Sequence, residues 1–307
     1  MIVVAGGSGT LGTRLLALLG DRGLDLRILT RDPDKARSLV RNEVEIEPGD
    51  VTDAATLERA VAGARTVVSA ITGFGPARDV SPRTVDWQGN ANLIRAARAA
   101  GVEHFILLSV CQAAPDHPIE LFRMKYRAEE ELRASGLAWT IIRPTAYMET
   151  WLHVLGDPLL QTGSTRMFGR GENPINFVSA DDVAGFVDLA VMDQAMRGAT
   201  VDTGGPENLT MSQVVETFQA VTGARGKVSH VPLPMLRVMS AVMKPFNPTM
   251  AGLAEASVVM DTRDMTFDAS DTRGRYPSVP MTRLADVVRK DYADRSAASL
   301  PQLARQA

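Results

Sequence analysis

Hydrophobic residues in the first half of the chain form short continuous runs, separated by stretches in which they recur at helical spacing. Continuous runs without polar alternation are typical of strands that helices cover on both faces of a parallel sheet. Because connections between parallel strands are right-handed, this pattern predicts an α/β fold with a doubly wound parallel sheet. The expected strands are 2–5, 24–29, 44–46, 66–71, 104–109 and 138–142, and the expected helices are 11–19, one opening at Asp32-Pro33, 53–62, 84–100 and 119–134.

The second half of the chain is less regular. Residues 156–175 are rich in Gly, Thr and Arg, which predicts a loop. Short strands are expected at 176–178, 200–203 and 227–231. Two helices are expected as well, one capped by Asp181 or Asp182 and running to Met192, and one over 210–222 that is capped at or near Thr210.

Methionine is frequent between Pro232 and Met260. Met235, Met239 and Met243 are spaced four residues apart, so they share one face of a helix, which Pro245 and Pro248 then break. Packing in the core is the simpler interpretation of this face. The alternative is an adaptable apolar wall over a substrate, since methionine fills irregular shapes.

Composition narrows the class of protein. A length of 307 residues fits one large domain or two closely associated ones, at about 150 residues per domain. The net charge of −3 argues against nucleic acid as a partner, because phosphate binding needs a cationic surface. A single cysteine, Cys111, and four scattered histidines predict neither a disulfide nor a metal site. No apolar run is long enough to span a membrane and no signal peptide is evident, so we expect a cytoplasmic protein without a membrane partner.

A glycine-rich turn follows the first strand and opens the first helix. Glycine permits a positive φ and lets a diphosphate approach the backbone, while the helix N-terminus offers free N–H groups and partial positive charge. This context predicts dinucleotide binding by Gly6, Gly7, Ser8, Gly9, Thr10, Leu11 and Gly12.

The residues after the second strand select the dinucleotide. An acidic residue there binds the ribose diol of NAD, whereas this chain has Thr30-Arg31, with Lys35 one turn later. The Arg31 guanidinium can bind a 2′-phosphate and stack on adenine, so NADP(H) is the preferred cofactor. In the alternative, Arg31 is a solvated loop residue, Asp32 binds the ribose, and NAD(H) is used.

Further cofactor contacts are expected at the ends of the third and fourth strands. Asp50 is placed to bind the adenine amino group, with Val51 packing beside it, although Asp50 could equally cap the turn into the next helix. Ala70, Ile71 and Thr72 lie where the cofactor crosses the edge of the sheet.

These residues resemble the short-chain dehydrogenase/reductase superfamily, in particular its atypical, NmrA-like branch. That branch includes quinone reductases, isoflavone-reductase-like enzymes and non-catalytic NADP-sensing regulators. The matching segments span about two-thirds of the chain: GGSGTLG (6–12), LTRDPDK (29–35), GDVTD (49–53), LLSV (107–110), FRMKYRAEEELRASGLAWTIIRPT (122–145) and NFVSADDVA (176–184).

The resemblance implies catalytic roles. The superfamily uses Tyr-x-x-x-Lys with a Ser at the end of the fifth strand, and here Lys125 and Ser109 are present while the Tyr position is Leu121. Lys125 is then expected to bind the nicotinamide ribose, with Pro144 also beside the cofactor. The alternative for Lys125 is a surface lysine on a charged helix.

Four other residues are weaker candidates. His117 could deliver a proton or be inert, Tyr147 could contact substrate or simply pack, and Ser109 could position a substrate oxygen. Cys111 is interpreted as a partly buried bystander. The Gly169-Arg170-Gly171 turn could cover the diphosphate as a flexible flap.

Together these features predict an NAD(P)-binding Rossmann core over 1–150 and a smaller substrate lobe over 151–307, with returning Rossmann elements at about 176–204. The expected function is NADPH-dependent reduction, by hydride transfer, of a small apolar carbonyl, quinone, imine or enone. The alternatives are a non-catalytic NADP(H)-sensing regulator and a redox-neutral isomerase or cyclase. A homodimer through the helices at 84–100 and 119–134 is possible on the sequence.

Overall fold

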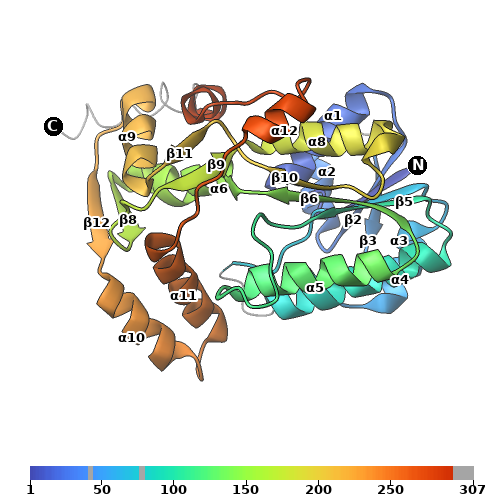
Figure 1. Ribbon diagram of the computed structural model, residues 1–307, viewed down its shortest axis with the longest axis horizontal. Helices are drawn as coiled ribbons and strands as arrows, with labels where there is room; N and C mark the ends of the chain where they lie inside the picture. Colours follow the sequence, from blue (N-terminus) through green and yellow to red (C-terminus); the bar gives the residue numbers. More distant parts are fainter. Residues whose placement is uncertain (41–43, 76–79, 293–307) are drawn as a thin grey trace. The chain divides into compact units, whose positions relative to one another are not determined.

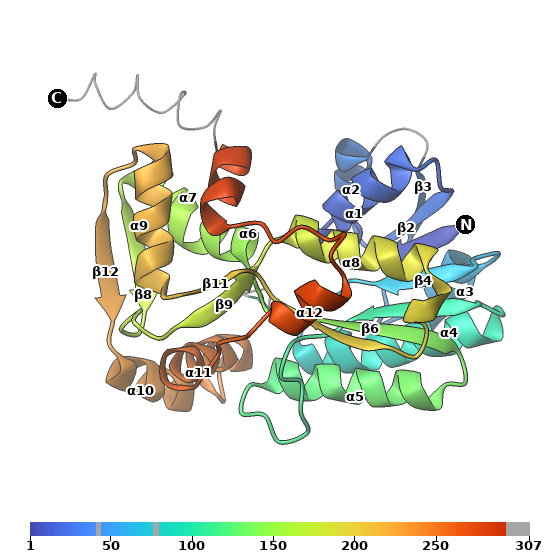
Figure 2. The same ribbon diagram turned by 45° about the horizontal axis from the view of Figure 1, so that its top comes forward.

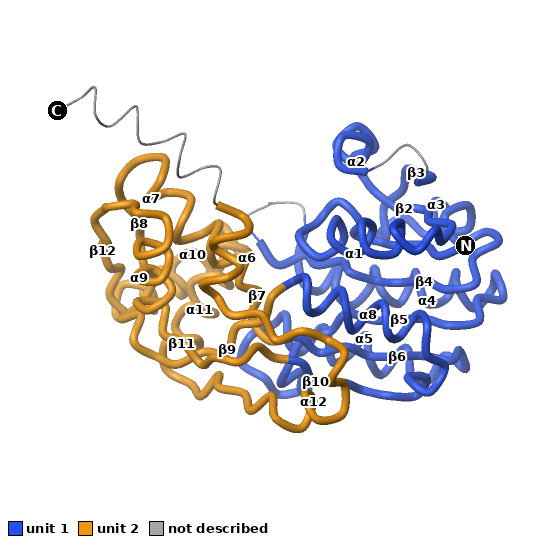
Figure 3. Tube along the Cα trace, turned by 90° about the horizontal axis from the view of Figure 1, so that it is seen from above, with its two compact units in different colours: residues 1–144, 180–203 blue, residues 145–179, 204–307 orange. Residues whose placement is uncertain are grey.

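The computed structural model describes residues 1–40, 44–75 and 80–292. The chain forms two compact units (Figure 3). Unit 1 comprises Met1–Pro144 and Ala180–Thr203, and unit 2 comprises Thr145–Ser179 and Gly204–Ala307. The chain therefore leaves unit 1 after residue 144, returns for an α-helix, the short 3-10 helix η3 (Gln194–Met196) and a strand, and leaves again.

Unit 1 is built on a seven-stranded sheet with the order β10-β6-β5-β4-β1-β2-β3. Every neighbouring pair is parallel, so all seven carboxyl ends lie at one edge. The predicted doubly wound parallel sheet is confirmed. Its strands are β1 (Ile2–Ala5), β2 (Leu26–Thr30), β3 (Glu45–Pro48), β4 (Thr66–Ser69), β5 (His104–Leu108), β6 (Ala138–Pro144) and β10 (Thr200–Thr203).

Helices cover both faces of this sheet (Figure 1). One face carries α1 (Thr10–Asp21), α2 (Pro33–Leu39) and α8 (Ala180–Met192). The other carries α3 (Ala54–Val61), α4 (Asn90–Ala99) and α5 (Glu120–Ala134). The central strands are buried accordingly, with all residues of β1 and β5 less than 9% exposed. This double cover explains why the strands carry no polar alternation.

Local chemistry sets the ends of several helices. The Asp32 carboxylate accepts a hydrogen bond from the backbone N–H of Lys35 at 2.9 Å, with Pro33 at the first helical position of α2. Asp53 caps α3 in the same way through Ala55. The helix expected at 84–100 begins earlier, at Pro82, because Ser81 and Thr84 form a capping box. Its first part, η1 (Pro82–Gly89), is a π-helical segment that continues into α4.

Unit 2 contains two small sheets and several helices (Figure 2). Its three-stranded sheet has the order β11-β9-β7, and β8 pairs with β12 in parallel. Phe177 and Phe218, both fully buried, lie in the core of the unit. The elements are β7 (Ala146–Tyr147), α6 (Met148–Trp151), η2 (Leu152–Gly156), α7 (Asp157–Thr162), β8 (Ser164–Phe168), β9 (Ile175–Val178), β11 (Glu207–Leu209), α9 (Met211–Thr222), β12 (Lys227–Val231), α10 (Leu233–Met243), α11 (Pro248–Thr262) and α12 (Ser270–Arg275).

The loop expected at 156–175 is a wrong prediction, since this segment contains α7 and β8. Gly163, with a φ of +69°, ends α7 in the left-handed conformation. Along β8 the residues alternate between exposed and buried positions, with Thr165 and Met167 inside. The segment is polar because half of the strand faces solvent, and its parallel partner β12 lies far away in the sequence.

Three smaller expectations are also wrong. Asp181 and Asp182 do not precede their helix, because α8 begins at Ala180 and places both in its first turn. The methionine stripe on α10 is not a core face throughout, since Met235 is 60% exposed while Leu236 is the buried residue of the helix. The expectation that Pro248 breaks the same helix is wrong as well, because α10 already ends at Met243. Pro248 instead starts α11, where the Asn247 side chain accepts a hydrogen bond from the backbone N–H of Met250.

In the three described stretches of the chain, no helix is long and apolar enough to cross a membrane. The same residues contain no cluster of three or more His, Cys, Asp or Glu side chains suited to a metal ion.

We expect His104, at the start of β5, to make unit 1 sensitive to acid. The side chain is 2% exposed, and its Nε2 lies 2.9 Å from the Thr140 hydroxyl, whose own proton goes to the carbonyl of Met196. Burial, with a smaller contribution from Arg197, lowers the pKa of His104 from 6.5 to about 4. Between these values the unfolded chain binds a proton that the folded chain does not, so stability is lost as the pH falls.

The loss reaches about 3 kcal/mol at pH 4, at about 1.4 kcal/mol for each unit of pKa. Urea unfolding across this range should show the slope in the wild type. A His104→Asn variant, which cannot titrate, should show a shallower dependence, and an identical slope in both proteins would exclude this role for His104.

Candidate active site

The glycine-rich turn lies between β1 and α1 at the carboxyl edge of the sheet in unit 1. Gly6 has a φ of +85°, and a Cβ added to it would lie 2.6 Å from the carbonyl oxygen of Ala70, just beyond β4. A Cβ on Gly12 would lie 2.3 Å from the carbonyl oxygen of Gly6. Glycine is therefore required at both positions, once for backbone conformation and twice for close packing.

The N-terminus of α1 is suited to an anion. Its N-cap, Gly9, contributes no side-chain hydrogen bond, and the first turn contains no acidic residue. The N–H groups of Thr10, Leu11 and Gly12 have no acceptor within the helix, by the geometry of a helix start. Ser8 lies half-buried in the turn and Gly7 is buried beside Ile28. A diphosphate fits this set of donors.

Arg31, Asp32 and Lys35 follow β2 and are exposed. Asp32 uses its carboxylate as the cap of α2, and Asp34 pairs with Arg37 at 2.9 Å. Among the described residues, Arg31 forms no ion pair. Asp32, the acidic residue that would have to bind a ribose diol, is thus occupied by the hydrogen bond that caps α2. The Arg31 guanidinium, which suits a 2′-phosphate, is available.

Asp50 follows β3, and its Oδ1 accepts hydrogen bonds from the backbone N–H and the hydroxyl of Thr52, both at 2.8 Å. It therefore holds the turn, while Asp53 caps the following helix. Val51 beside it is 8% exposed and contacts Gly89, where a Cβ would lie 2.7 Å from its Cγ2. An adenine contact by Asp50 stays a prediction.

Lys125 is buried, with 4% of the residue exposed, so the alternative of a surface lysine is wrong. Its ammonium donates hydrogen bonds to the carbonyl oxygens of Ile71 and Leu108, each at 2.8 Å. These carbonyls lie at the carboxyl ends of the neighbouring strands β4 and β5. Lys125 thus ties the two strand ends together, and a bond to a cofactor ribose stays a prediction that would have to displace or share one of these contacts.

Asp86 is the counter-ion of Lys125, and the sequence did not point to it. Its Oδ1 lies 3.0 Å from Lys125 Nζ, and its Oδ2 accepts the backbone N–H of Gly73 at 2.8 Å. The side chain is fully buried, and burial raises the pKa of Asp86 against the lowering effect of Lys125. The sequence did contain a hint of this residue, since Asp86 lies at helical spacing from Asn90, which is buried and whose amide donates to the Asp86 carbonyl oxygen at 2.7 Å.

Thr72, between Ile71 and Gly73, is exposed at this edge of the sheet.

Ser109 belongs to a second buried network. Its hydroxyl donates to the fully buried Glu129, one turn after Lys125 on α5. Arg143 makes two hydrogen bonds to the same carboxylate, from Nε at 2.8 Å and from Nη2 at 2.5 Å, and Arg133 adds a third at 3.1 Å. The network joins β5, α5 and β6. A contact between Ser109 and a substrate oxygen stays a prediction.

His117 and Cys111 lie on the segment between β5 and α5. The His117 ring stacks on Phe122 at 4.0 Å, and its Nδ1 accepts the backbone N–H of Ile119 at 3.2 Å. Burial, followed by the charge of Asp202, raises the pKa of Cys111 to about 12, so its thiol stays protonated at neutral pH. The backbone N–H of Cys111 donates to the carbonyl of Pro144, which is buried at the end of β6.

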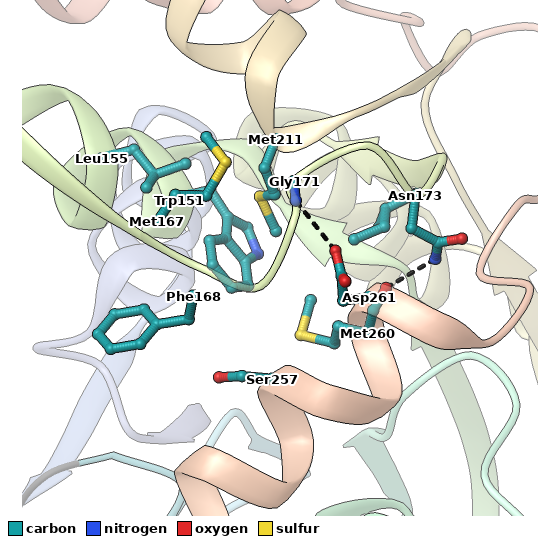
Figure 4. A pocket seen from close by; sticks show the side chains of 11 residues that line it. Trp151, Leu155, Met167, Phe168, Gly171, Asn173, Met211, Ser257, Met260 and Asp261 are labelled. Carbon is teal, nitrogen blue, oxygen red and sulfur yellow. Dashed lines mark hydrogen bonds between the residues drawn. The ribbon is translucent and has the colours of Figure 1, made fainter. Parts of the chain in front are cut away.

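Unit 2 has an apolar cavity of its own, of about 40 Å³ (Figure 4). Met260, from the methionine-rich segment, and Trp151 line it, but Met235, Met239 and Met243 do not. The remaining lining residues are Leu155, Met167, Phe168, Gly171, Asn173, Ile175, Met211, Ser257 and Asp261.

Tyr147 belongs to unit 2 but does not line this cavity. Burial and the nearby Glu149 carboxylate raise the pKa of Tyr147 above its usual value, so the phenol keeps its proton. Its contact with a substrate stays a prediction.

The turn at 169–171 is not the free flap that the glycines suggest. The buried carboxylate of Asp261 accepts hydrogen bonds from the backbone N–H groups of Arg170 at 3.1 Å and Gly171 at 3.0 Å. The Arg170 side chain binds the same residue (Figure 4 shows the Gly171 bond). The left-handed glycines serve this tight turn, since a Cβ on Gly171 would collide with Met167 Sδ at 1.9 Å.

Comparison with known proteins identifies the family. A family model described as NAD(P)H-binding matches residues 6–194. The chain belongs to this NAD(P)H-binding family. The resemblance to the atypical, NmrA-like short-chain dehydrogenases/reductases is thereby confirmed, and so is the expectation of a nicotinamide dinucleotide as cofactor.

Among relatives, an NAD(P)H azoreductase from Xenophilus azovorans is 30% identical over 73% of this chain and 74% of its own length. The photosystem II assembly factor Ycf39 from Synechocystis is 28% identical over 87% of this chain and 82% of its own length.

Solved structures share the fold. The NADPH-dependent quinone oxidoreductase QOR2 from Escherichia coli, complexed with NADPH, aligns with a TM-score of 0.73 at 23% identity, covering 94% of this chain and 99% of its own. Triphenylmethane reductase from Citrobacter aligns with a TM-score of 0.71 at 20% identity over the same shares.

We predict that Asp86→Asn lowers the free energy of unfolding by about 3–5 kcal/mol, because it leaves the Lys125 ammonium buried without its counter-ion. Urea unfolding measures the loss. Asp34→Asn, at an exposed surface pair, serves as the control and should change stability by less than about 1 kcal/mol. The double variant Asp86→Asn with Lys125→Met should recover much of the loss, and a stable Asp86→Asn single variant would contradict the pairing.

We predict that Arg31→Ala weakens NADPH binding about 10- to 150-fold, the value of one charge-assisted hydrogen bond, and leaves NADH binding nearly unchanged. Fluorescence titration with each nucleotide measures both constants. Arg37→Ala, on the helix α2 that follows Arg31, is the matched control. Equal losses for the two nucleotides would show that Arg31 does not contact the 2′-phosphate.

Proposed function

We propose that this protein is an NADPH-dependent reductase of small apolar acceptors. The observation that carries the proposal is the exposed Arg31 after β2. The neighbouring acid, Asp32, is engaged as the cap of α2. In the same unit, the β1–α1 turn and the N-terminus of α1 suit a diphosphate. The azoreductase among the relatives supports the assignment of reduction to this family member.

Bound NADPH would supply the hydride. The N–H groups of Thr10, Leu11 and Gly12 would hold its diphosphate, and Arg31, with Lys35 on the next turn, would hold its 2′-phosphate. Ala70, Ile71 and Thr72 would line its crossing of the sheet edge, in the strand end that Lys125 and Asp86 hold in place. The protein would thus hold the cofactor in position against the substrate and exclude competing reactions.

The class of acceptor is inferred from the absence of the superfamily tyrosine on α5. Leu121 stands where the superfamily has a tyrosine, so this position supplies no hydroxyl to protonate a ketone oxygen. Quinones, whose reduction by hydride leaves a resonance-stabilised phenolate, need less acid assistance and are therefore favoured over simple ketones. Azo compounds are added as candidates because of the azoreductase among the relatives. Tyr147, whose phenol stays protonated, and His117 are the candidate donors for the remaining proton.

A second candidate function is a binding role without turnover, in which NADP(H) occupancy controls association with another protein. The same Leu121 supports it, and so does the Ycf39 assembly factor among the relatives. A redox-neutral reaction on the same fold is the third alternative, since fold alone does not choose the chemistry.

Turnover assays separate these functions. We expect NADPH oxidation, followed by the absorbance of the reduced nicotinamide, with quinones and azo dyes and much less with simple ketones. Tight NADPH binding with no turnover across the panel would support the binding role instead. Conversion of a substrate with no net change in the nicotinamide would support the redox-neutral alternative.

A further inference from the structure

The helix α10 in unit 2 presents apolar side chains to solvent. Met235, Val238 and Val242 are 60%, 63% and 60% exposed, and Phe246, in the turn just after the helix, is 83% exposed. At about 100° per residue, the three helical positions fall within an arc of about 60°. Large hydrophobic residues exposed singly are ordinary, but three of them on one side of a short helix and a fourth in the turn after it indicate an interaction surface.

The patch is separate from the packing of the helix. Leu236, fully buried, is the residue that anchors α10, and the neighbouring α11 contributes buried Ala251 and Ala254. Figure 1 shows α10 at an outer margin of unit 2 beside α11. The exposed arc is therefore not needed to hold the helix in place, so its apolar character calls for a partner.

The chain segment that carries the patch is basic, although Glu255, on the neighbouring α11, is also exposed. Between Glu216 and Glu255 the chain carries no acidic residue, although the whole chain has a net charge of −3. The same stretch contains four Lys and Arg residues: Arg225, Lys227, Arg237 and Lys244. Arg237 lies on α10 and Lys244 directly follows it, and both are exposed. A partner that is apolar in part and negatively charged would complement both the exposed apolar side chains and the two exposed cations of α10 and its end.

We propose that α10 docks on the surface of an anionic lipid bilayer, lying in the plane of the interface. Its apolar arc would enter the boundary between headgroups and acyl chains. Arg237 and Lys244 lie on the polar side of the helix, about 130° and 150° from the centre of the arc, and their long stems would carry their charges to anionic headgroups. A second copy of the chain fits less well, because a symmetric contact would bring the basic residues of both copies together without acidic partners from this stretch.

This inference does not depend on the proposed function. It departs from the expectation of no membrane partner, which was based on the lack of a spanning segment. A helix of this length that lies on a membrane needs no such segment.

Vesicle flotation with the full chain tests the proposal. The wild type should float with phosphatidylcholine vesicles that contain phosphatidylglycerol, float weakly with phosphatidylcholine alone, and be released by high salt, which screens exposed charges. Val242→Ser combined with Phe246→Ser should lower the partition coefficient at least about 10-fold. Arg237→Gln combined with Lys244→Gln should lower it about 10-fold on anionic vesicles and hardly at all on neutral ones.

Val154→Ser combined with Met192→Ser is the matched control, since these residues are 43% and 54% exposed but lie outside α10. Circular dichroism checks that every variant folds. Absence of wild-type flotation, or equal losses in the control, would overturn the proposal. So would analytical ultracentrifugation showing a dimer without lipid that the Val242→Ser and Phe246→Ser pair dissociates, because the patch would then be an interface between copies.

Discussion

A buried ammonium group holds together the edge of the sheet on which the rest of unit 1 depends. Lys125 binds the carbonyl ends of β4 and β5, and its partner Asp86 fixes the backbone at Gly73. The glycine turn before α1 packs against the same strand end, at Ala70. A buried ammonium is costly unless it is paired and hydrogen-bonded, so these contacts must be made together. The proposed cofactor site is thus shaped by charges that solvent does not reach.

Much of the fold could be predicted from the sequence because it depends on near neighbours. The strand runs, the glycine turn and the cap by Asp32 are each determined by residues a few positions apart. The partners of Lys125 could not be predicted, since Ile71 lies 54 residues away in the chain. The strand β8 was missed for the same reason, because its partner is β12. Met235 was misjudged because periodicity identifies an apolar face and not what covers it.

The structure also changes the meaning of several expected site residues. Lys125 and Ser109, which the superfamily resemblance implies as catalytic, both belong to buried networks that join neighbouring elements of unit 1. Groups at the sheet edge that are open to a ligand include the N-terminus of α1, Arg31 and Thr72. The described residues therefore account for binding of the cofactor better than they account for transfer of a proton. The acceptors that we propose are accordingly those whose reduction depends least on a proton donor. A protein that reduces apolar acceptors would gain from contact with a membrane, where such molecules partition.

The most direct measurement is calorimetric titration of the wild-type protein with NADPH and with NADH. Binding at the β1–α1 turn with Arg31 on the 2′-phosphate predicts saturable heat with NADPH at one site per chain and weaker binding of NADH. No heat with either nucleotide, or tighter binding of NADH, would contradict the assignment of this edge as an NADPH site.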